Sequence, residues 1–217
     1  MTAYTFRLAT NDDRSEIRRL QAQFVDELSD PLGVVEGNHD RSAFVLVETR
    51  HGRGKRAVGI MSLMRASSAP FVFEQVFPDV WEHLDPGAVI GRTDIGRDHL
   101  AEVDWAYVEK EHRGNNLALL LFAGTVLLAQ RWGYPACVAI ANPASLAVMG
   151  SAFHTVGLSS ELSSVLYELG LIFPARAASR MASIVRHTLA RDPGLVWRVP
   201  GLRNEQRHLG PQSASLQ

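Results

Sequence analysis

The stretch EKEHRGNNLALLLFAG (Glu109–Gly124) joins a charged turn that contains a glycine to a long apolar run. It follows LAEVDWAYV (Leu100–Val108), whose composition is typical of a strand. Together they predict a strand, a turn at Gly114, and a helix that begins near Asn115 and runs to about Arg131. The N–H groups of a helix's first turn attract anions, so the turn suits a phosphate group. When the stretch is taken alone, a plain strand-to-helix connection explains it at least as well as a phosphate-binding turn does. Turns of both kinds commonly contain a glycine.

Strand patterns and helix patterns alternate on both sides of this stretch. Alternating apolar residues predict strands, and apolar residues at helical spacing predict helices. Before the stretch we expect a strand at 4–10, a helix at 11–28, a hairpin of strands at 42–49 and 57–66, and an irregular segment at 67–99. After it we expect a strand at 136–141, a helix at 142–157, a last strand at 161–169 and a C-terminal helix at 174–192. Early hairpins and later crossover helices predict an α/β fold, a mixed sheet with helices packed on it.

The bulk composition excludes several classes of protein. The chain has 217 residues and a formal net charge of −1, so its overall charge does not attract nucleic acid or an anionic membrane. Cys137 is the single cysteine, which excludes an internal disulfide and a cysteine-based metal cluster, and we expect no metal site. No apolar run approaches the roughly 20 residues of a membrane span, and the N-terminus lacks the pattern of a signal peptide. We therefore expect a cytoplasmic protein.

The predicted order of elements resembles the GNAT superfamily of acyltransferases. In that family a valine ends the fourth strand, and an Arg/Gln-x-x-Gly-x-Gly/Ala loop leads into a helix. Val108 takes the place of the valine, and Asn142 matches the asparagine that follows the family's fifth strand. The loop corresponds to Arg113, Gly114, Asn115, Asn116, Leu117 and Ala118, with Asn116 where the family usually has glycine. The resemblance implies a mostly antiparallel sheet. It also implies binding of acyl-CoA, or of the phosphopantetheine arm of an acyl carrier protein, at these residues.

A narrower resemblance lies in the segment before this strand. SLMRASSAPFVFEQVFPDVWEHL (Ser62–Leu84) and the later AEVDWAYV are similar to the acyl-homoserine-lactone synthases and the long-chain N-acyl amino acid synthases. Those enzymes place a glutamate six residues before the valine, as Glu102 stands before Val108. The lactone synthases continue with a Ser-Arg pair, whereas this chain has Asp104 and Trp105. The resemblance implies an N-acyltransferase acting on a small-molecule primary amine such as an amino acid, without implying homoserine lactone synthesis.

The resemblance also implies direct attack of an amine on an acyl thioester, which requires a group that takes a proton from the amine. Glu102 and Asp104 share one face of the predicted strand, because side chains alternate along a strand with a period of two. We expect Glu102 to be the general base and Asp104 to be the second candidate. The alternative is that one of them is a solvated or ion-paired strand residue. Backbone N–H groups near Val108 would stabilise the oxygen of the thioester.

Aromatic residues are frequent in the irregular segment at 67–99. They either pack this segment onto the sheet or form the wall of a pocket for an acyl chain, because large rings favour burial in both arrangements. The candidate pocket residues are Phe71, Phe73, Phe77, Trp81, Trp105 and Phe153. Phe153 also stands where GNAT enzymes often have a tyrosine, so we expect no tyrosine general acid at that position.

Three parts are predicted along the chain: an acyltransferase-like domain at 1–170, in which 67–99 is an insertion, a helical extension at 171–199, and a polar tail at 200–217. The positive charge of the extension suits either a carrier protein or plain solvent, and it comes from Arg176, Arg180, Arg186 and Arg191. The altered loop at Asn116 keeps a second function open, that of a catalytically silent module that binds acyl-CoA as a sensor or interaction partner. The sequence does not predict the oligomeric state.

Overall fold

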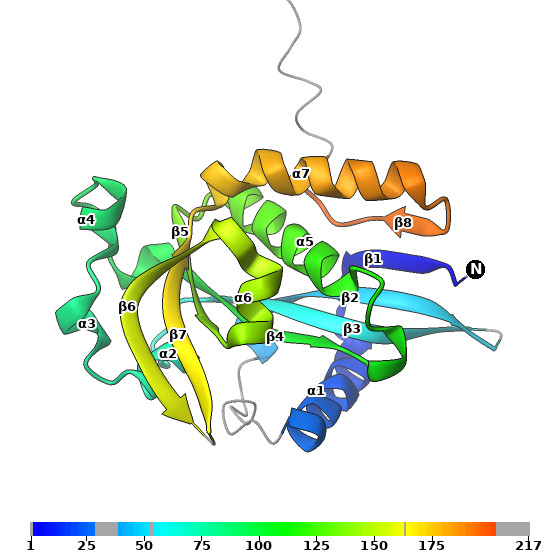
Figure 1. The fold of residues 1–217 in the computed structure, drawn as a ribbon, viewed down its shortest axis with the longest axis horizontal. Coiled ribbons are helices and arrows are strands. Elements are labelled where there is room, and N and C mark those ends of the chain that lie inside the picture. Colours follow the sequence, from blue (N-terminus) through cyan, green and yellow to red (C-terminus); the bar gives the residue numbers. More distant parts are fainter. Residues whose placement is uncertain (1, 29–38, 53, 163, 203–217) are drawn as a thin grey trace, which may run out of the picture.

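A computed structural model describes residues 2–28, 39–52, 54–162 and 164–202. Its centre is one sheet of eight strands in the order β6-β7-β5-β4-β3-β2-β1-β8 (Figure 1). The strands are β1 (Tyr4–Leu8), β2 (Ser42–His51), β3 (Gly54–Arg65), β4 (Leu100–Val108), β5 (Ala136–Ala141), β6 (Phe153–Leu162), β7 (Val165–Ile172) and β8 (Leu195–Trp197). The pairs β4–β5 and β1–β8 run parallel, and the others run antiparallel. The predicted mixed, mostly antiparallel sheet flanked by helices is confirmed.

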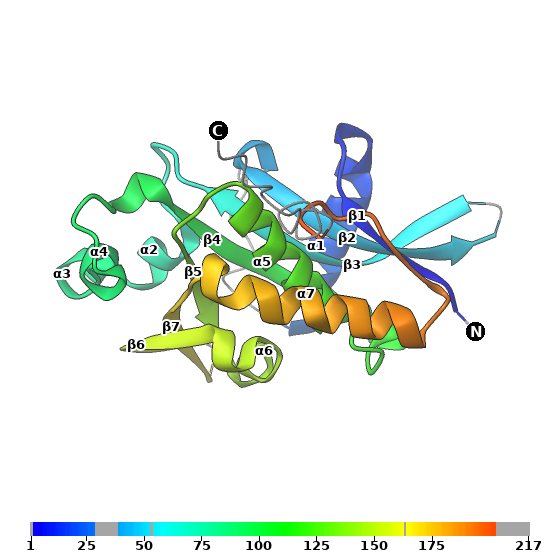
Figure 2. The ribbon, with the colours of Figure 1, turned by 90° about the horizontal axis from the view of Figure 1, so that it is seen from above.

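Helices cover both faces of the sheet. α5 (Leu117–Arg131) and α7 (Pro174–Arg191) lie over one face, and α1 (Arg14–Leu28) lies on the other (Figures 1 and 2). α5 is apolar nearly all round because it has the sheet on one side and α7 on another. The short helices are η1 (Asn11–Asp13), η3 (His39–Arg41), α2 (Val72–Val76), α3 (Val80–His83), α4 (Pro86–Ile90), η4 (Arg97–His99), η5 (Lys110–His112), α6 (Pro143–Met149) and η6 (Gly150–Ala152).

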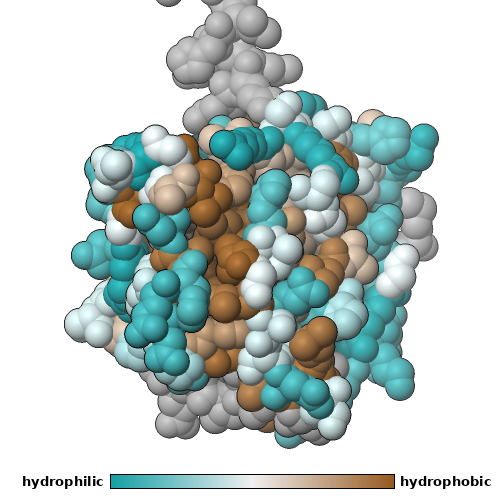
Figure 3. Space-filling model, turned by 60° about the vertical axis from the view of Figure 1, so that its left-hand side comes forward, coloured by the Kyte–Doolittle hydropathy of each residue, from teal (hydrophilic) through white to brown (hydrophobic). Residues whose placement is uncertain are grey.

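The segment at 67–99 packs against the sheet near β5 and β7. The rings of Phe71 and Phe73 are fully buried and stacked, with centroids 5.3 Å apart, and they share a cluster with residues of β4, β5 and β7. Figure 3 looks onto this side of the molecule and shows apolar surface in the middle of the face, bordered by polar side chains. The partly buried apolar residues packed against the cluster are Ala66, Val76, Ile90, Ile140, Val156 and Leu158.

The structure departs from the sequence prediction after Met149. The predicted helix at 142–157 is wrong beyond that residue, because α6 ends there and β6 begins at Phe153. Gly150 has φ 53° and ψ −135°, a conformation that favours glycine and ends the helix. Exposed and half-buried residues then alternate along much of β6, as they do in a strand. The sequence prediction also missed the short helices within 67–99 and the strand β8.

Candidate active site

The strands β4 and β5 separate part-way along their length. They pair from Leu100 to Val103 on β4, opposite Ala136 to Ala139 on β5, and the recorded pairing ends there. The second half of β4 continues to Val108 along β3, on its other side. A gap therefore opens between two central strands of the sheet.

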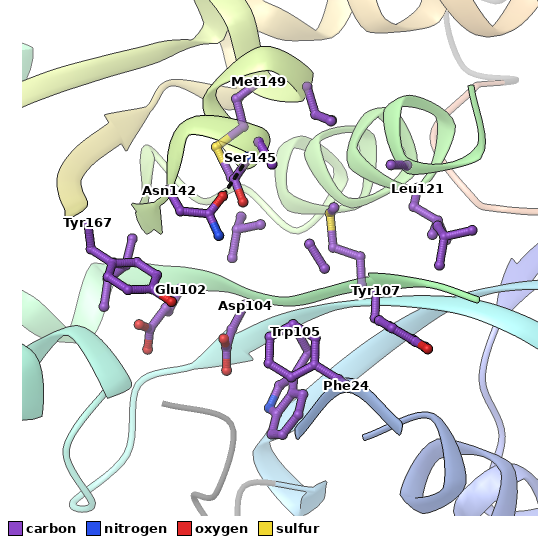
Figure 4. A pocket seen from close by; sticks show the side chains of 18 of the residues that line it. Phe24, Glu102, Asp104, Trp105, Tyr107, Leu121, Asn142, Ser145, Met149 and Tyr167 are labelled. Atoms are coloured by element: carbon purple, nitrogen blue, oxygen red, sulfur yellow. Dashed lines mark hydrogen bonds between the residues drawn. The ribbon is translucent and has the colours of Figure 1, made fainter. Parts of the chain in front are cut away.

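A bulge in β4 shapes one edge of this gap. Tyr107 lies opposite Ile60 of β3, whereas Asp104 lies opposite Ser62, so β4 carries one residue more than its partner. Trp105 lies within the bulge and has a φ of 51°. Figure 4 shows the side chains of Asp104 and Trp105 on the same side of the β4 ribbon, where a regular strand would send them to opposite faces.

A cavity of about 360 Å³ fills the gap between the strands. Most of its lining is apolar or aromatic with a few polar groups, as is typical of sites for small molecules. Figure 4 shows Asn142, Ser145 and Met149 on one side of β4, which we call the α6 side, and Glu102 and Asp104 on the other, which we call the α1 side. The lining residues are Phe24, Met61, Val72, Glu102, Val103, Asp104, Trp105, Ala106, Tyr107, Val108, Arg113, Ala118, Leu121, Ile140, Asn142, Ala144, Ser145, Val148, Met149 and Tyr167.

Glu102 is a buried carboxyl with two backbone donors. Glu102 is only 1% exposed. Its Oε2 accepts the N–H of Val72 at 2.8 Å, and its Oε1 accepts the N–H of Phe73 at 2.9 Å. It thereby joins the start of α2 to β4. Burial, followed by the charge of Asp104, raises the pKa of Glu102 well above its ordinary value of 4.5, against the opposing effect of the two N–H donors.

Asp104 lies two residues further along the same face and is more open than Glu102. It is half-buried and lines the cavity beside the ring of Trp105. Arg41 of η3 is the cation whose charge acts on both carboxyls, while burial lowers the pKa of its own guanidinium. The α1 side therefore combines two carboxyls of different exposure with a nearby positive charge.

The loop after β4 turns sharply before α5 begins at Leu117. Gly114 has a φ of 84° and Asn116 a φ of 57°, both in the left-handed region, which glycine and asparagine adopt more readily than other residues. The side chain of Asn116 makes no capping hydrogen bond to the first turn of α5. The asparagine in the loop thus permits the tight turn and leaves the first-turn N–H groups uncapped by its own side chain.

Arg113 folds back over the end of β4. Its Nε donates to the carbonyl oxygen of Val108 at 2.9 Å, and its Nη1 lies 2.7 Å from Oε1 of Glu27 in α1. The guanidinium also lies over the ring of Tyr107, with its central carbon 5.7 Å from the ring centroid. Arg113 therefore ties the loop to α1 and β4 while part of it lines the cavity.

Asn142 begins α6 on the opposite edge of the gap. Its Oδ1 accepts the N–H of Ser145 at 2.9 Å, a side-chain cap that fixes the start of the helix. Figure 4 shows its amide nitrogen turned toward the cavity. A ligand that passes between β4 and α6 would meet this donor.

Comparisons with known proteins agree on the fold. No protein-family model and no curated protein matches the sequence. A CoA-dependent acyl-homoserine lactone synthase, BjaI, solved with SAM and isopentyl-CoA, is 18% identical with a TM-score of 0.62, over 92% of this chain and 95% of that one. FeeM, an N-acyl amino acid synthase from uncultured soil microbes, is 13% identical with a TM-score of 0.57, over 82% and 99%. A putative N-acetyltransferase from Lactobacillus plantarum is 10% identical with a TM-score of 0.54, over 79% and 98%.

This chain has the GNAT fold. The resemblance predicted from the sequence, to GNAT acyltransferases and more narrowly to the lactone and N-acyl amino acid synthases, is confirmed at the level of structure.

Some of the site residues predicted from the sequence line the cavity, and others do not. Both carboxyls line it, together with Val108, Arg113, Ala118 and Asn142. Gly114, Asn115 and Asn116 line a second hollow on the outer side of the loop. Leu117, the first residue of α5, is buried.

Most of the predicted aromatic pocket residues lie elsewhere. Trp105 lines the cavity, whereas Phe71, Phe73 and Phe77 are buried in the cluster behind Glu102. Trp81 is 38% exposed, and its indole N–H donates to Glu74. Phe153 packs its ring over Gly170 of β7. The structure thus supports the packing interpretation for the rings of the 67–99 segment.

Several lining residues were not singled out from the sequence. Phe24 comes from α1, and its ring contacts those of Trp105 and Tyr107 at centroid distances of 5.4 and 6.0 Å. Tyr167 comes from β7, whose partners are set by tertiary pairing. Ala144, Val148 and Met149 lie on one face of α6, and this spacing was the one available signal in the sequence.

Two further findings concern the described part of the chain. No helix there is long and apolar enough to cross a membrane. The same residues contain no group of three or more His, Cys, Asp or Glu side chains that would hold a metal ion.

Proposed function

We propose that this protein is an N-acyltransferase that moves an acyl group from acyl-CoA to the primary amine of a small molecule such as an amino acid. The observation that carries the proposal is the cavity through the gap between β4 and β5, with carboxyls on its α1 side and the α6 cap on the other. The likeness to a CoA-dependent synthase and to an N-acyl amino acid synthase supports both the donor and the acceptor class. A carrier-protein donor remains to be compared with CoA in the assays below.

The two sides of the cavity suit the two substrates. The thioester arm would enter on the α6 side, past the loop and the amide of Asn142, with its acyl chain against Leu121, Val148 and Met149. The amine would come from the α1 side, where a carboxylate attracts the protonated form; the ammonium loses one proton to solvent, and the carboxylate accepts the second proton during the attack. The reacting carbon would lie in the gap between them.

Asp104 is the base in this proposal, and Glu102 has a structural role. Both oxygens of Glu102 already accept backbone N–H groups, and its raised pKa favours the protonated form. Asp104 is more exposed and lies on the same face, so it can meet the amine directly or through a water. This choice reverses the order in which the sequence ranked the two residues.

The proposed reaction is a direct transfer. The neutral amine nitrogen attacks the thioester carbonyl carbon, and its proton passes to the carboxylate of Asp104. Backbone N–H groups in the half of β4 that does not pair with β5 would stabilise the developing oxyanion. The carbon–sulfur bond then breaks, the amide is released, and the leaving thiolate takes up the proton from Asp104 through solvent, which regenerates the carboxylate.

The test is release of free thiol from acyl-CoA and from acyl carrier protein, with a panel of primary amines and amino acids. We expect turnover with acyl-CoA, and Asp104→Asn should lower kcat by about 100-fold, within the range for loss of a general base. Asp79→Asn, at an exposed position of the 67–99 segment, is the matched control and should leave kcat unchanged. Binding of acyl-CoA without turnover of any donor would favour the silent binding module instead.

A further inference from the structure

Aromatic rings form much of the wall on the α1 side of the cavity. The ring of Phe24 lies 5.4 Å from that of Trp105 and 6.0 Å from that of Tyr107, measured between centroids. Trp105 and Tyr107 are buried, and Phe24 is half-buried. Figure 4 shows Trp105 and Phe24 on the same side of β4 as Asp104. A ligand that enters from the α1 side therefore meets flat apolar surface next to a carboxyl.

The polar groups at the end of this wall are already engaged with one another. The hydroxyl of Tyr107 donates to Oε2 of Glu27 at 2.9 Å. Oε1 of the same carboxylate lies 2.7 Å from Nη1 of Arg113. Tyr107 thus lines the cavity while its hydroxyl is bonded to α1, and the charge of Arg113 is balanced by Glu27.

The remaining charge of the lining is negative. Among the described lining residues, the acidic side chains are Glu102 and Asp104, and the one basic side chain is Arg113. Since Arg113 is paired with Glu27, no further basic side chain of that described lining balances the two carboxyls. Such a cavity attracts an ammonium group and repels a carboxylate that enters with it.

Arg41 is the other cation near the two carboxyls, and its guanidinium is bonded to the turn that follows β3. It donates to Oγ of Ser67 and to the carbonyl oxygens of Ala69 and Pro70. Arg41 is not among the described residues that line the cavity. The sequence of 29–38, which joins α1 to η3, contains no lysine or arginine. These parts of the chain therefore add no cation to the lining.

We infer that the acceptor is an apolar primary amine without a carboxylate, such as an aralkylamine, whose apolar body packs against Phe24 and Trp105. The inference rests on the proposed function and narrows its acceptor, while the transfer step stays the same. The ammonium is attracted to the carboxylate of Asp104 and to the faces of the rings. Burial of the apolar body adds to binding. An amino acid would bring its own carboxylate into a space that is already negative, at the cost of desolvation without a new ion pair.

The wild-type protein gives the first test, by release of free thiol from acyl-CoA. Phenethylamine and phenylalanine differ by the carboxylate alone. We expect kcat/KM to be higher for phenethylamine by about tenfold or more, because two like charges in a partly buried site repel each other. Phenylalaninamide, which has nearly the size of phenylalanine and no negative charge, should resemble phenethylamine. Phenylalanine loses its ammonium proton more readily than phenethylamine, so a larger share of neutral amine would not produce this preference.

An added cation gives the second test. Phe24→Arg places a guanidinium on the α1 side of the cavity, and it should lower the preference for phenethylamine over phenylalanine by about fivefold. Ala22→Arg adds the same charge at an exposed position of α1 outside the cavity lining, and it should leave the preference unchanged. Phe24→Leu removes the ring without adding charge, so the preference should survive. The comparison in the wild-type protein decides the inference even where Phe24→Arg does not fold.

Each remaining result counts against one of the two proposals. Equal use of phenethylamine and phenylalanine by the wild-type protein, or preference for phenylalanine, would overturn the inference and leave the proposed function standing. An equal change of preference in Phe24→Arg and Ala22→Arg would remove the acceptor from the α1 side of the cavity, and would also overturn it. Absence of turnover with every donor and every amine would reject the proposed function itself, and with it the inference.

Discussion

At the scale of single residues, Glu102 and Asp104 are similar side chains in different environments, one fully buried and the other half-buried. The sequence identified both, because they share a strand face and match a spacing. It ranked Glu102 first, because sequence spacing carries no information on the N–H groups of Val72 and Phe73, which reach Glu102 from the 67–99 segment. In our proposal, burial and hydrogen bonding give Glu102 a structural role and leave Asp104 to accept the proton from the amine.

Glu102 should make the stability of the protein depend on pH. Its folded-state pKa is raised, so the folded chain binds more protons than the unfolded chain once the pH exceeds about 4.5. The contribution of Glu102 to the free energy of unfolding is therefore complete below that pH. It falls as the pH rises, by at most about 1.4 kcal/mol per pH unit. Glu102→Gln removes the titration, so chemical denaturation between pH 5 and 8 should show a flatter dependence than in the wild-type protein. An unchanged slope would contradict the raised pKa.

At the scale of elements, the connection from β4 to α5 depends on backbone angles that the sequence partly revealed. The strand end at Val108 and the helix to Arg131 follow from local pattern, and both are observed. Asn116 was the departure from the family loop, and its left-handed φ explains why asparagine replaces glycine there. The first part of β6 was mistaken for helix because α6 and η6 occupy residues 143–152 directly before it. β8 was missed because its three residues gain strand character from pairing with β1.

Substitution of Asn116 tests this backbone requirement. Asn116→Val should lower the free energy of unfolding by about 1–2 kcal/mol, since a β-branched residue is strained at positive φ. Asn116→Gly should change it by less than about 1 kcal/mol, because relief of strain is offset by a freer unfolded chain. Urea denaturation measures both. Asn115→Val is the control, because the φ of Asn115 is not positive, and a loss there equal to that of Asn116→Val would contradict the argument.

At the scale of the whole molecule, the C-terminal part completes the core around α5. Met181 and Val185 of α7 are buried in the same cluster as α5 and the sheet, and Trp197 of β8 stacks on Phe6 with centroids 5.4 Å apart. The start of α5 faces one hollow on each side of its loop. The position of the loop therefore depends on α7 and β8 as well as on β4, so the packing that stabilises the fold also shapes the site.

Two substitutions distinguish the two interpretations of the aromatic segment at 67–99, which are packing onto the sheet and a wall for the acyl chain. Phe73 is fully buried behind Glu102, so Phe73→Ala should lower the free energy of unfolding by about 3–5 kcal/mol without changing the preferred acyl length. Ala144 lines the cavity from α6, so Ala144→Phe should shift the preference toward shorter chains with little loss of stability. Each methylene that no longer fits costs about 0.8 kcal/mol of binding. Thermal denaturation, with kcat/KM for donors from acetyl to decanoyl, measures both effects. A changed chain-length preference in Phe73→Ala, with none in Ala144→Phe, would assign the acyl wall to the 67–99 segment after all.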